Sequence, residues 1–301
     1  MNNWKGVFPA ATTQFHQDLS LDLDLTARHI EVLISSGVSG IVMLGSLGEN
    51  ASLSLEEKRE VVRTALSASA GRVPVLSGVA ELNTAAAIAW VKELETLGAA
   101  GAMVMPSMGF RPDREETLAH YSGVARGTSL PLLLYNNPIS YHADVTPEML
   151  EVLAEEKNYV AIKESCGDPR RLTDIYNRVG NRFTLFAGVD DLILESVLLG
   201  AEGWIAGAGL AFPRENQALW ELAVAGRWEE ARDLYRWFAP LLHLDIGPKF
   251  VQNIKLAMQE MGYGREWVRL PRLTLTGERR QQVLAVIQAA IENPAKLLIH
   301  G

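Results

Sequence analysis

Short apolar runs rich in β-branched residues alternate with longer amphipathic stretches along the first three quarters of the chain. Each run is continuously apolar, which is typical of strands that are covered on both faces. Strand and helix in regular alternation predict βα units around a parallel sheet. Eight such runs occur, at 7–12, 40–45, 73–79, 101–106, 131–137, 159–165, 183–189 and 203–207.

The stretches between these runs carry signals for helix starts and ends. A Ser or Thr followed by Glu at the third position can close a capping box, and proline suits the first helical turn. Eight βα units within about 225 residues predict a (β/α)8 TIM barrel rather than a doubly wound sheet, which usually has fewer strands. The start signals are Ser54-Leu-Glu-Glu57, Thr146-Pro147, Asp168-Pro169 and Phe212-Pro213, and the glycines expected at helix ends are Gly37, Gly98 and Gly200.

The strand signal ends after the helix that begins at Pro213. Residues 226–301 contain helical patterns only, at 228–241, 248–261 and 277–291. We therefore expect a catalytic barrel over 1–225 and a C-terminal helical domain over 226–301. The aromatic residues of that domain are expected to be packing anchors; they are Trp228, Tyr235, Trp237 and Phe238.

Composition and charge exclude several classes of protein. The chain has 301 residues, of which 48% are hydrophobic and 21% charged, which is ordinary for a globular enzyme. A formal charge of −8 with scattered basic residues argues against a nucleic-acid or membrane partner. The single cysteine, Cys166, excludes an internal disulfide, and the histidines lack metal-ligand spacing. We expect a soluble, cytoplasmic enzyme without a metal or an organic cofactor.

In a barrel of this kind the reactive residues lie at the carboxyl ends of the strands. Lys163 stands near the end of the run 159–165, among apolar residues. Burial lowers the pKa of a lysine, and a neutral amine attacks carbonyl groups, so Lys163 is a Schiff-base candidate. The alternatives are a lysine paired with Glu164 or Glu49, or one directed into solvent.

Tyr135 ends the preceding run, one strand away from Lys163. A phenol at the mouth of the barrel can move protons to and from an intermediate on Lys163. Alternatively, Tyr135 caps the core of the barrel and its hydroxyl binds the backbone.

Three loops that follow predicted strands offer binding groups. Gly45-Ser-Leu-Gly-Glu49 can form a nest of backbone amides that suits a carboxylate, although it also fits a plain βα turn. In Gly188-Val-Asp-Asp191 the carboxylates of Asp190 and Asp191 can bind substrate hydroxyls or cap a helix. His142 is the only histidine placed near the expected mouth, and Cys166 has no histidine near it in sequence.

With these motifs the sequence resembles the dihydrodipicolinate synthase and N-acetylneuraminate lyase family of class I Schiff-base enzymes. The resemblance implies a (β/α)8 barrel with Lys163 as nucleophile and Tyr135 as proton donor and acceptor. It also implies that the amides of Ser46 and Leu47 and the backbone near Ile205 bind the carboxylate of a 2-oxo acid. The motifs are Gly6-Val-Phe-Pro-Ala-Ala-Thr-Thr13, Gly45-Ser-Leu-Gly-Glu49 with Leu53 and Glu57, Tyr135-Asn-Asn-Pro138 and Ile162-Lys-Glu-Ser165.

Three departures from the synthases narrow the expected function. Those enzymes carry two threonines at the positions of Ser46 and Leu47, and the second belongs to a hydroxyl relay that Leu47 cannot replace. They have a tyrosine after strand four, whereas the segment 106–112 contains none. Their substrate-binding arginine is replaced by Ser140.

Five stretches are more similar to the branch of 1-pyrroline-4-hydroxy-2-carboxylate deaminases, which act in hydroxyproline breakdown. They lie at 45–50, 135–138, 188–191, 237–245 and 249–255. That resemblance implies a Schiff-base deaminase that forms 2,5-dioxopentanoate and ammonia, with Ser140 and Asp191 as further substrate-binding residues. The alternatives are an aldolase, lyase or dehydratase that releases pyruvate from a hydroxylated 2-oxo acid, or a non-catalytic barrel that binds oxo acids. In every case the expected ligand is a small 2-oxo acid or a cyclic imino acid, and we expect a homo-oligomer, either a tetramer or a dimer.

Overall fold

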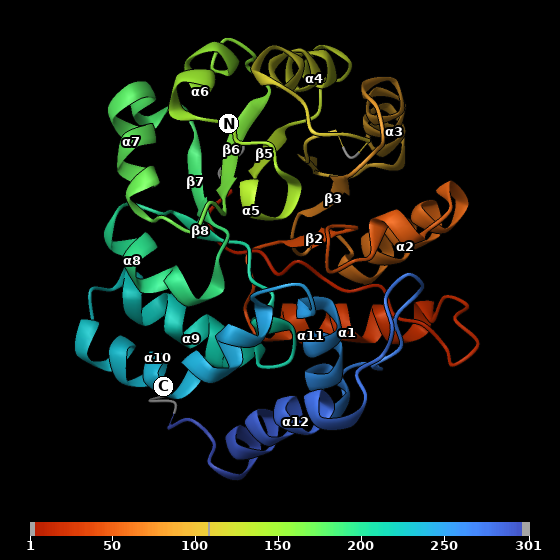
Figure 1. Ribbon diagram of the computed structural model, residues 1–301, viewed down its shortest axis with the longest axis vertical. Helices are drawn as coiled ribbons and strands as arrows, with labels where there is room; N and C mark the ends of the chain where they lie inside the picture. The colour runs from red at the N-terminus through yellow and green to blue at the C-terminus, as the bar shows by residue number, and fades with distance from the viewer. Residues whose placement is uncertain (1–3, 108, 297–301) are drawn as a thin grey trace.

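Eight parallel strands form a closed barrel in the computed structural model, which describes residues 4–107 and 109–296 (Figure 1). The sheet runs in the order β1-β8-β7-β6-β5-β4-β3-β2. The segment after β1 closes the ring, because Val42 N donates to Pro9 O at 2.9 Å and Ala11 N to Val42 O at 2.9 Å. This confirms the predicted TIM barrel. The strands are β1 (Gly6–Val7), β2 (Ile41–Met43), β3 (Val75–Val79), β4 (Gly101–Val104), β5 (Leu132–Asn136), β6 (Tyr159–Glu164), β7 (Thr184–Ala187) and β8 (Gly203–Trp204).

Most of the strands are shorter than the apolar runs that predicted them. The run 101–106 ends as a strand at Val104, and the run 183–189 at Ala187. The remaining apolar residues leave the hydrogen-bonded ladder at the carboxyl ends of the strands, where they enter loops that are still buried. Hydrophobicity records burial rather than pairing, so it cannot mark where a strand ends.

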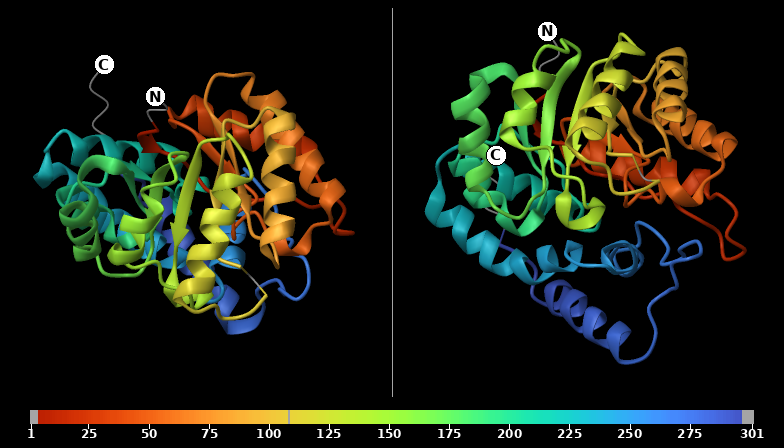
Figure 2. Two further views of the ribbon diagram at one scale, coloured as in Figure 1. Left: turned by 90° about the horizontal axis from the view of Figure 1, so that it is seen from above. Right: turned by 45° about the horizontal axis from the view of Figure 1, so that its top comes forward.

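Helices surround the barrel, and two views from other sides show them on its outer face (Figure 2). The predicted capping box is present, since Ser54 Oγ accepts from Glu57 N and the Glu57 side chain accepts from Ser54 N. Pro147 and Pro213 stand in the first turns of α6 and α9, as predicted. The helices are α1 (Leu23–Ser35), α2 (Leu55–Ser69), α3 (Thr84–Leu97), α4 (Arg114–Arg126), α5 (Pro138–Tyr141), α6 (Pro147–Leu153), α7 (Arg170–Val179), α8 (Ile193–Leu198), α9 (Pro213–Val224), α10 (Trp228–Leu242), α11 (Phe250–Glu260) and α12 (Gly277–Glu292).

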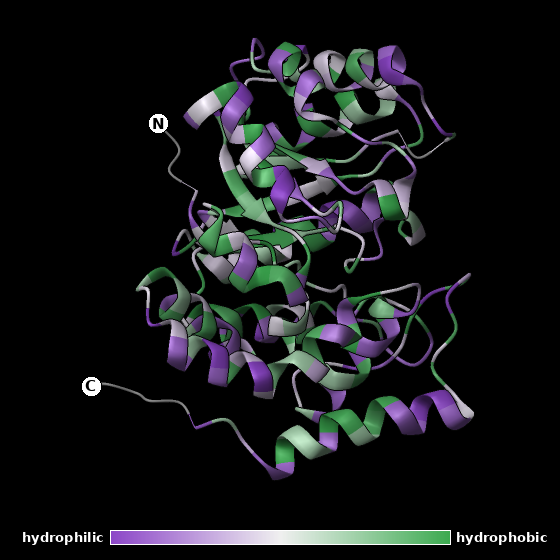
Figure 3. Cartoon of the chain, turned by 60° about the vertical axis from the view of Figure 1, so that its left-hand side comes forward, coloured by the Kyte–Doolittle hydropathy of each residue, from purple (hydrophilic) through white to green (hydrophobic). Residues whose placement is uncertain are grey.

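The strands are predominantly hydrophobic, whereas the outer helices carry polar residues on their solvent faces (Figure 3). Inside the barrel Phe8 and Phe186 meet edge to face, with ring centroids 5.3 Å apart. A Cβ at Gly40 would lie 2.1 Å from the Phe8 ring, and one at Gly203 would lie 2.2 Å from the Phe186 ring. These two glycines therefore create the space into which the aromatic rings pack. None of the described helices is long and apolar enough to cross a membrane.

Helices α10, α11 and α12 lie together beside the barrel and pack on one another (Figure 1). Trp237 stacks on Phe238 with centroids 5.6 Å apart, and Phe212 meets both rings edge to face. Tyr235 is half-buried against the core, but Trp228 is exposed, so the expectation that it is a packing anchor was wrong. Trp228 is the first residue of α10, where its side chain lies outside the buried stripe of that helix. The division at residue 225 stays a prediction.

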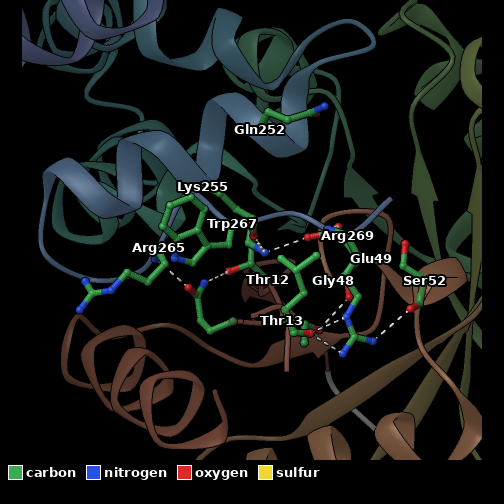
Figure 4. A network of polar contacts seen from close by, with 12 residues as sticks. Thr12, Thr13, Gly48, Glu49, Ser52, Gln252, Lys255, Arg265, Trp267 and Arg269 are labelled. Atoms are coloured by element: carbon green, nitrogen blue, oxygen red, sulfur yellow. Dashed lines mark hydrogen bonds and ion pairs between the residues drawn. The ribbon is translucent and has the colours of Figure 1, made fainter. Parts of the chain in front are cut away.

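A buried polar network joins the loop after β2 to the C-terminal helices (Figure 4). Lys255 Nζ lies 2.8 Å from Glu49 Oε1, and both side chains are 0% exposed. Lys255 Nζ also donates to Trp267 O at 2.6 Å, and Arg269 N donates to Glu49 Oε2 at 3.0 Å. The Arg269 guanidinium in turn reaches Glu57 at the start of α2. Each charge therefore has a partner, as burial requires.

Removing one member of the buried ion pair between Lys255 and Glu49 should destabilise the protein strongly. We expect Lys255→Met or Glu49→Gln to lower the free energy of unfolding by about 3–5 kcal/mol, because the remaining group stays buried without its partner. Urea denaturation followed by circular dichroism measures the change. Arg236→Gln, which breaks an exposed ion pair with Asp233, is the control and should have no measurable effect. Single variants that unfold like the native protein would contradict this prediction.

Candidate active site

A cavity of about 450 Å³ opens at the carboxyl ends of the strands. Its wall combines loops of the barrel with the start of the C-terminal helical segment. Strand ends contribute Tyr135 and Lys163, and residues before and within α11 complete the rim. The described lining residues are Ala10, Gly45, Ser46, Leu47, Met103, Tyr135, Asn137, Ile139, Ser140, Tyr141, Lys163, Ser165, Gly188, Val189, Asp190, Ile205, Gly207, Asp245, Ile246, Gly247, Pro248 and Phe250.

Lys163 is buried in this wall with only 8% of its surface exposed. Its amine lies 4.3 Å from the centroid of the Tyr135 ring, and the two residues are register partners on β5 and β6. The two glutamates that the sequence offered as its partners are engaged elsewhere. Glu164 accepts hydrogen bonds from Asn136 and from the amide of Cys166, and Glu49 is paired with Lys255. Lys163 makes no ion pair within the described part of the chain.

Burial lowers the pKa of Lys163 to about 8, although the charges of Asp245 and Asp190 oppose this shift. Desolvation disfavours the ammonium more than the neutral amine, and the charges of the two aspartates only partly offset this. At pH 7 a pKa of about 8 leaves about a tenth of the amine neutral, against far less than a hundredth for an ordinary lysine. This arrangement is suited to nucleophilic attack on a carbonyl or an imine.

Tyr135 presents its phenol beside this amine. Asn137 Nδ2 donates to the Tyr135 hydroxyl oxygen at 3.0 Å, and burial raises the pKa of Tyr135 to about 12. The phenol is therefore protonated at neutral pH and can give a proton to an intermediate on Lys163. The alternative, in which the Tyr135 hydroxyl binds the backbone, does not match this contact.

The loop after β2 presents free backbone amides to the cavity. Leu44 and Glu49 both have left-handed φ angles, 55° and 54°, which bend the loop tightly. The amides of Ser46 and Leu47 donate no hydrogen bond within the residues that the structure describes. By contrast, the amide of Ile205 is already bound to Ala187 O at 3.0 Å. Ile205 lines the cavity, but its own amide is not available for the carboxylate.

The two aspartates after β7 have different surroundings. Asp190 is buried, and it accepts from Trp204 Nε1 at 2.9 Å and from the amides of Gly207 and Ala208 at 3.0 and 2.7 Å. It therefore holds the loop after β8 in place. Asp191 is not among the cavity's described lining residues, and its carboxylate lies 3.6 Å from His243 Nε2. The geometry thus does not place Asp191 where a substrate would bind.

Three other candidates occupy the loops around the cavity. Ser140 lies in its wall, at the position where the synthases were expected to carry arginine. His142 is exposed and lies outside the described lining, because the chain turns away after α5. Burial raises the pKa of the Cys166 thiol to about 11, so it stays protonated and is a poor nucleophile.

No role was expected from the sequence for Tyr141, or for Asp245, which ends the stretch 237–245 that resembles the deaminases. Both residues line the cavity. The Tyr141 hydroxyl is hydrogen-bonded to Ser46 Oγ, and its ring meets Tyr135 edge to face at 5.8 Å. Burial raises the pKa of Tyr141. This pair supplies hydroxyl groups that the segment 106–112 and Leu47 lack, so the departures at those two places do not leave the site without hydroxyls. The only sequence signal for Tyr141 was its position shortly after Pro138.

The described residues contain no cluster of three or more His, Cys, Asp or Glu side chains that could hold a metal ion. The functional groups among the cavity's described lining residues are an amine, phenols, serine hydroxyls, backbone amides and carboxyl groups.

Comparison with known proteins identifies close relatives over nearly the whole chain. The model of the family described as "Dihydrodipicolinate synthetase family" matches residues 3–290. A 4-hydroxy-tetrahydrodipicolinate synthase of Archaeoglobus fulgidus is 34% identical over 289 residues, covering 95% of this chain and 98% of the relative. One of Xanthomonas campestris is 36% identical over 274 residues, covering 90% and 89%.

Solved structures are similar in fold. Dihydrodipicolinate synthase of Aquifex aeolicus has a TM-score of 0.91 at 27% identity, covering 97% of this chain and all 100% of that one. A prophage protein of the dihydrodipicolinic acid synthase family from E. coli K12, solved in complex with pyruvate, has a TM-score of 0.88 at 28% identity, covering 95% and 98%.

The lowered pKa of Lys163 predicts how its reactivity depends on pH. With pyruvate as a probe, the rate of adduct formation trapped by cyanoborohydride should rise about tenfold per pH unit below pH 8 and level off above it, because the neutral amine is the nucleophile. Intact mass and peptide mapping measure the adduct on Lys163. Lys163→Arg is the control and should give none, since a guanidinium stays protonated. A rate that still rises tenfold per unit beyond pH 9 would rule out the lowered pKa.

Proposed function

The chain belongs to the dihydrodipicolinate synthetase family of lyase-type Schiff-base enzymes, and we propose that this member converts 1-pyrroline-4-hydroxy-2-carboxylate to 2,5-dioxopentanoate and ammonia. The observation that carries the proposal is the buried, unpaired amine of Lys163 beside the phenol of Tyr135. An electrophilic carbon next to a carboxylate is the substrate group that such a pair can attack.

The free amides of Ser46 and Leu47 give the substrate carboxylate a place to bind. Convergent amides without an internal partner favour a small anion. With the carboxylate there, C2 of the substrate is brought towards Lys163. Leu47 adds an apolar surface that suits a compact, ring-derived substrate.

In the first half of the reaction Lys163 adds to C2 of the cyclic imine. The C2–N1 bond breaks, so the ring opens to a Schiff base on Lys163 and a free amine on C5. A proton then leaves C3, and the C4 hydroxyl takes up a proton and departs as water. Tyr135 moves these protons, and the protonated Schiff base accepts the electron pair from C3.

In the second half the new double bond shifts until C5 becomes an imine. One water hydrolyses that imine and releases ammonia, and a second water hydrolyses the Schiff base and frees Lys163. One water is formed and two are consumed, so the net reaction takes up one water per substrate.

The synthase activity named for the relatives fits this cavity less well, because Ser140 replaces the arginine expected there. A short neutral side chain cannot form the bidentate contact of a guanidinium with a second carboxylate. A lyase that releases pyruvate would use the same amine, phenol and amides, so it is the second candidate. A structural relative was solved in complex with pyruvate, and this observation favours the lyase as the second candidate.

Product analysis distinguishes these activities. Purified enzyme supplied with 1-pyrroline-4-hydroxy-2-carboxylate should release ammonia and 2,5-dioxopentanoate in equal amounts, measured by an ammonia-coupled assay and by mass spectrometry. Parallel assays measure pyruvate release from hydroxylated 2-oxo acids and formation of 4-hydroxy-tetrahydrodipicolinate. Lys163→Arg is the inactive control. No ammonia at high enzyme concentration would overturn the proposed reaction, and pyruvate release would establish the lyase.

The role given to Tyr135 predicts a specific defect. Tyr135→Phe should lower kcat for ammonia release by about 10²–10⁴-fold, because proton transfer loses its donor, while Lys163 still forms a trappable adduct. Tyr235→Phe is the matched control, since its hydroxyl donates to Asp191 O outside the cavity wall, and it should leave kcat unchanged. If Tyr135→Phe turns over at the native rate, Tyr135 does not transfer the proton.

A further inference from the structure

Asp245 brings a carboxyl group into the cavity from outside the barrel. It ends the short 3₁₀ helix η5 (His243–Asp245), which follows α10 directly. Its carboxyl group lies against the backbone of the loop after β8, where a Cβ at Gly207 would be 2.2 Å from Asp245 Oδ1. Only a glycine at 207 leaves room for the carboxyl group in this position.

The Oδ1 atom of Asp245 is buried and has no hydrogen-bond partner among the described residues. Asp190, the other carboxylate in the wall, accepts three hydrogen bonds from Trp204, Gly207 and Ala208. Leaving a buried acceptor unpaired is costly, so such an atom at a binding site indicates that the ligand supplies the donor. Asp190 is thereby assigned to the structure of the loop, and Asp245 is left available to a ligand.

We propose that Asp245 is a specificity-determining residue that binds a hydrogen-bond donor on the part of the substrate beyond C2. The identity of that donor rests on the proposed function. In that reaction the donor would be the C4 hydroxyl or the amine freed on C5. The carboxyl oxygens of Asp245 can accept from hydroxyl and amine groups, and Asp245 offers no cation to a second carboxylate. Together with Ser140, Asp245 would direct the site away from dicarboxylic substrates.

The surroundings of Asp245 support this role. The charged groups that act on it are Asp190, Lys163 and Asp191, and of these three Lys163 is the cation. Burial, followed by the charge of Asp190, raises the pKa of Asp245 well above its usual value. A donor from the substrate would replace the missing solvation.

Because Asp245 also acts on the amine of Lys163, the experiment must separate the two effects. Pyruvate has no group beyond its methyl carbon, so trapping of pyruvate reports on Lys163 alone. The variants are Asp245→Asn, which keeps the shape of the side chain, and Asp245→Ala. We expect both to lower kcat/KM for 1-pyrroline-4-hydroxy-2-carboxylate by about 10–100-fold, the range for a buried hydrogen-bonding group that is left without its partner. Pyruvate trapping should change much less.

Asp233→Asn is the matched control, because Asp233 is an exposed residue of α10 outside the described lining of the cavity. Trapping of 1-pyrroline-2-carboxylate, which lacks the hydroxyl, identifies the donor. If the variants trap it as well as the native enzyme does, the hydroxyl is the partner of Asp245; an undiminished defect points to the amine. Equal losses with pyruvate and with the hydroxylated substrate would overturn the proposal, as would no loss with either.

The role of Asp245 can be tested even if the protein does not catalyse the deaminase reaction. If the native enzyme releases no ammonia but forms an adduct with pyruvate, trapping is compared between pyruvate and 2-oxo acids that carry a 4-hydroxyl group. A defect of Asp245→Asn confined to the hydroxylated compounds supports Asp245 as the donor-binding residue, and the absence of such a defect overturns it. Circular dichroism confirms that each variant is folded.

Discussion

The buried ion pair between Lys255 and Glu49 is the contact on which the arrangement of the site depends. Both side chains are 0% exposed, and they connect α11 to the loop after β2. Because an unpaired charge in such a place is strongly unfavourable, the C-terminal helices can dock only in a position that satisfies Glu49. That docking holds the loop that contains the amides of Ser46 and Leu47, and it fixes α11, which begins five residues after Asp245.

The same pairing explains why one buried lysine is structural and another is suited to catalysis. Burial lowers the pKa of both Lys255 and Lys163 to about 8. Lys255 is nevertheless bound to Glu49 and to Trp267 O, so its amine is occupied. Among the residues that the structure describes, the amine of Lys163 has no ion pair or hydrogen bond, and it lies 4.3 Å from the centroid of the Tyr135 ring. The difference lies in the partners rather than in burial, and it leaves one amine free to react.

The cavity does not belong to the barrel alone. The strands supply Lys163 and Tyr135, whereas Asp245 and Phe250 come from the C-terminal helical segment. In the proposed function the reacting pair would be held on strands, and the groups that meet the rest of the substrate would come from loops and short helices. Such a division allows one reaction mechanism to serve different substrates, because loops can change without disturbing the barrel.

The linear pattern of residues was enough to predict the barrel, its eight strands, and Lys163 and Tyr135 at the ends of neighbouring strands. It was enough because burial periodicity, helix caps and strand ends are local properties, and because the register partners β5 and β6 are consecutive strands. Tertiary packing alone decided that Glu49 pairs with Lys255 rather than with Lys163, that Tyr141 reaches Ser46, and that Asp245 enters the cavity. These contacts join residues far apart along the chain, 206 positions in the case of Lys255 and Glu49, so no local pattern records them.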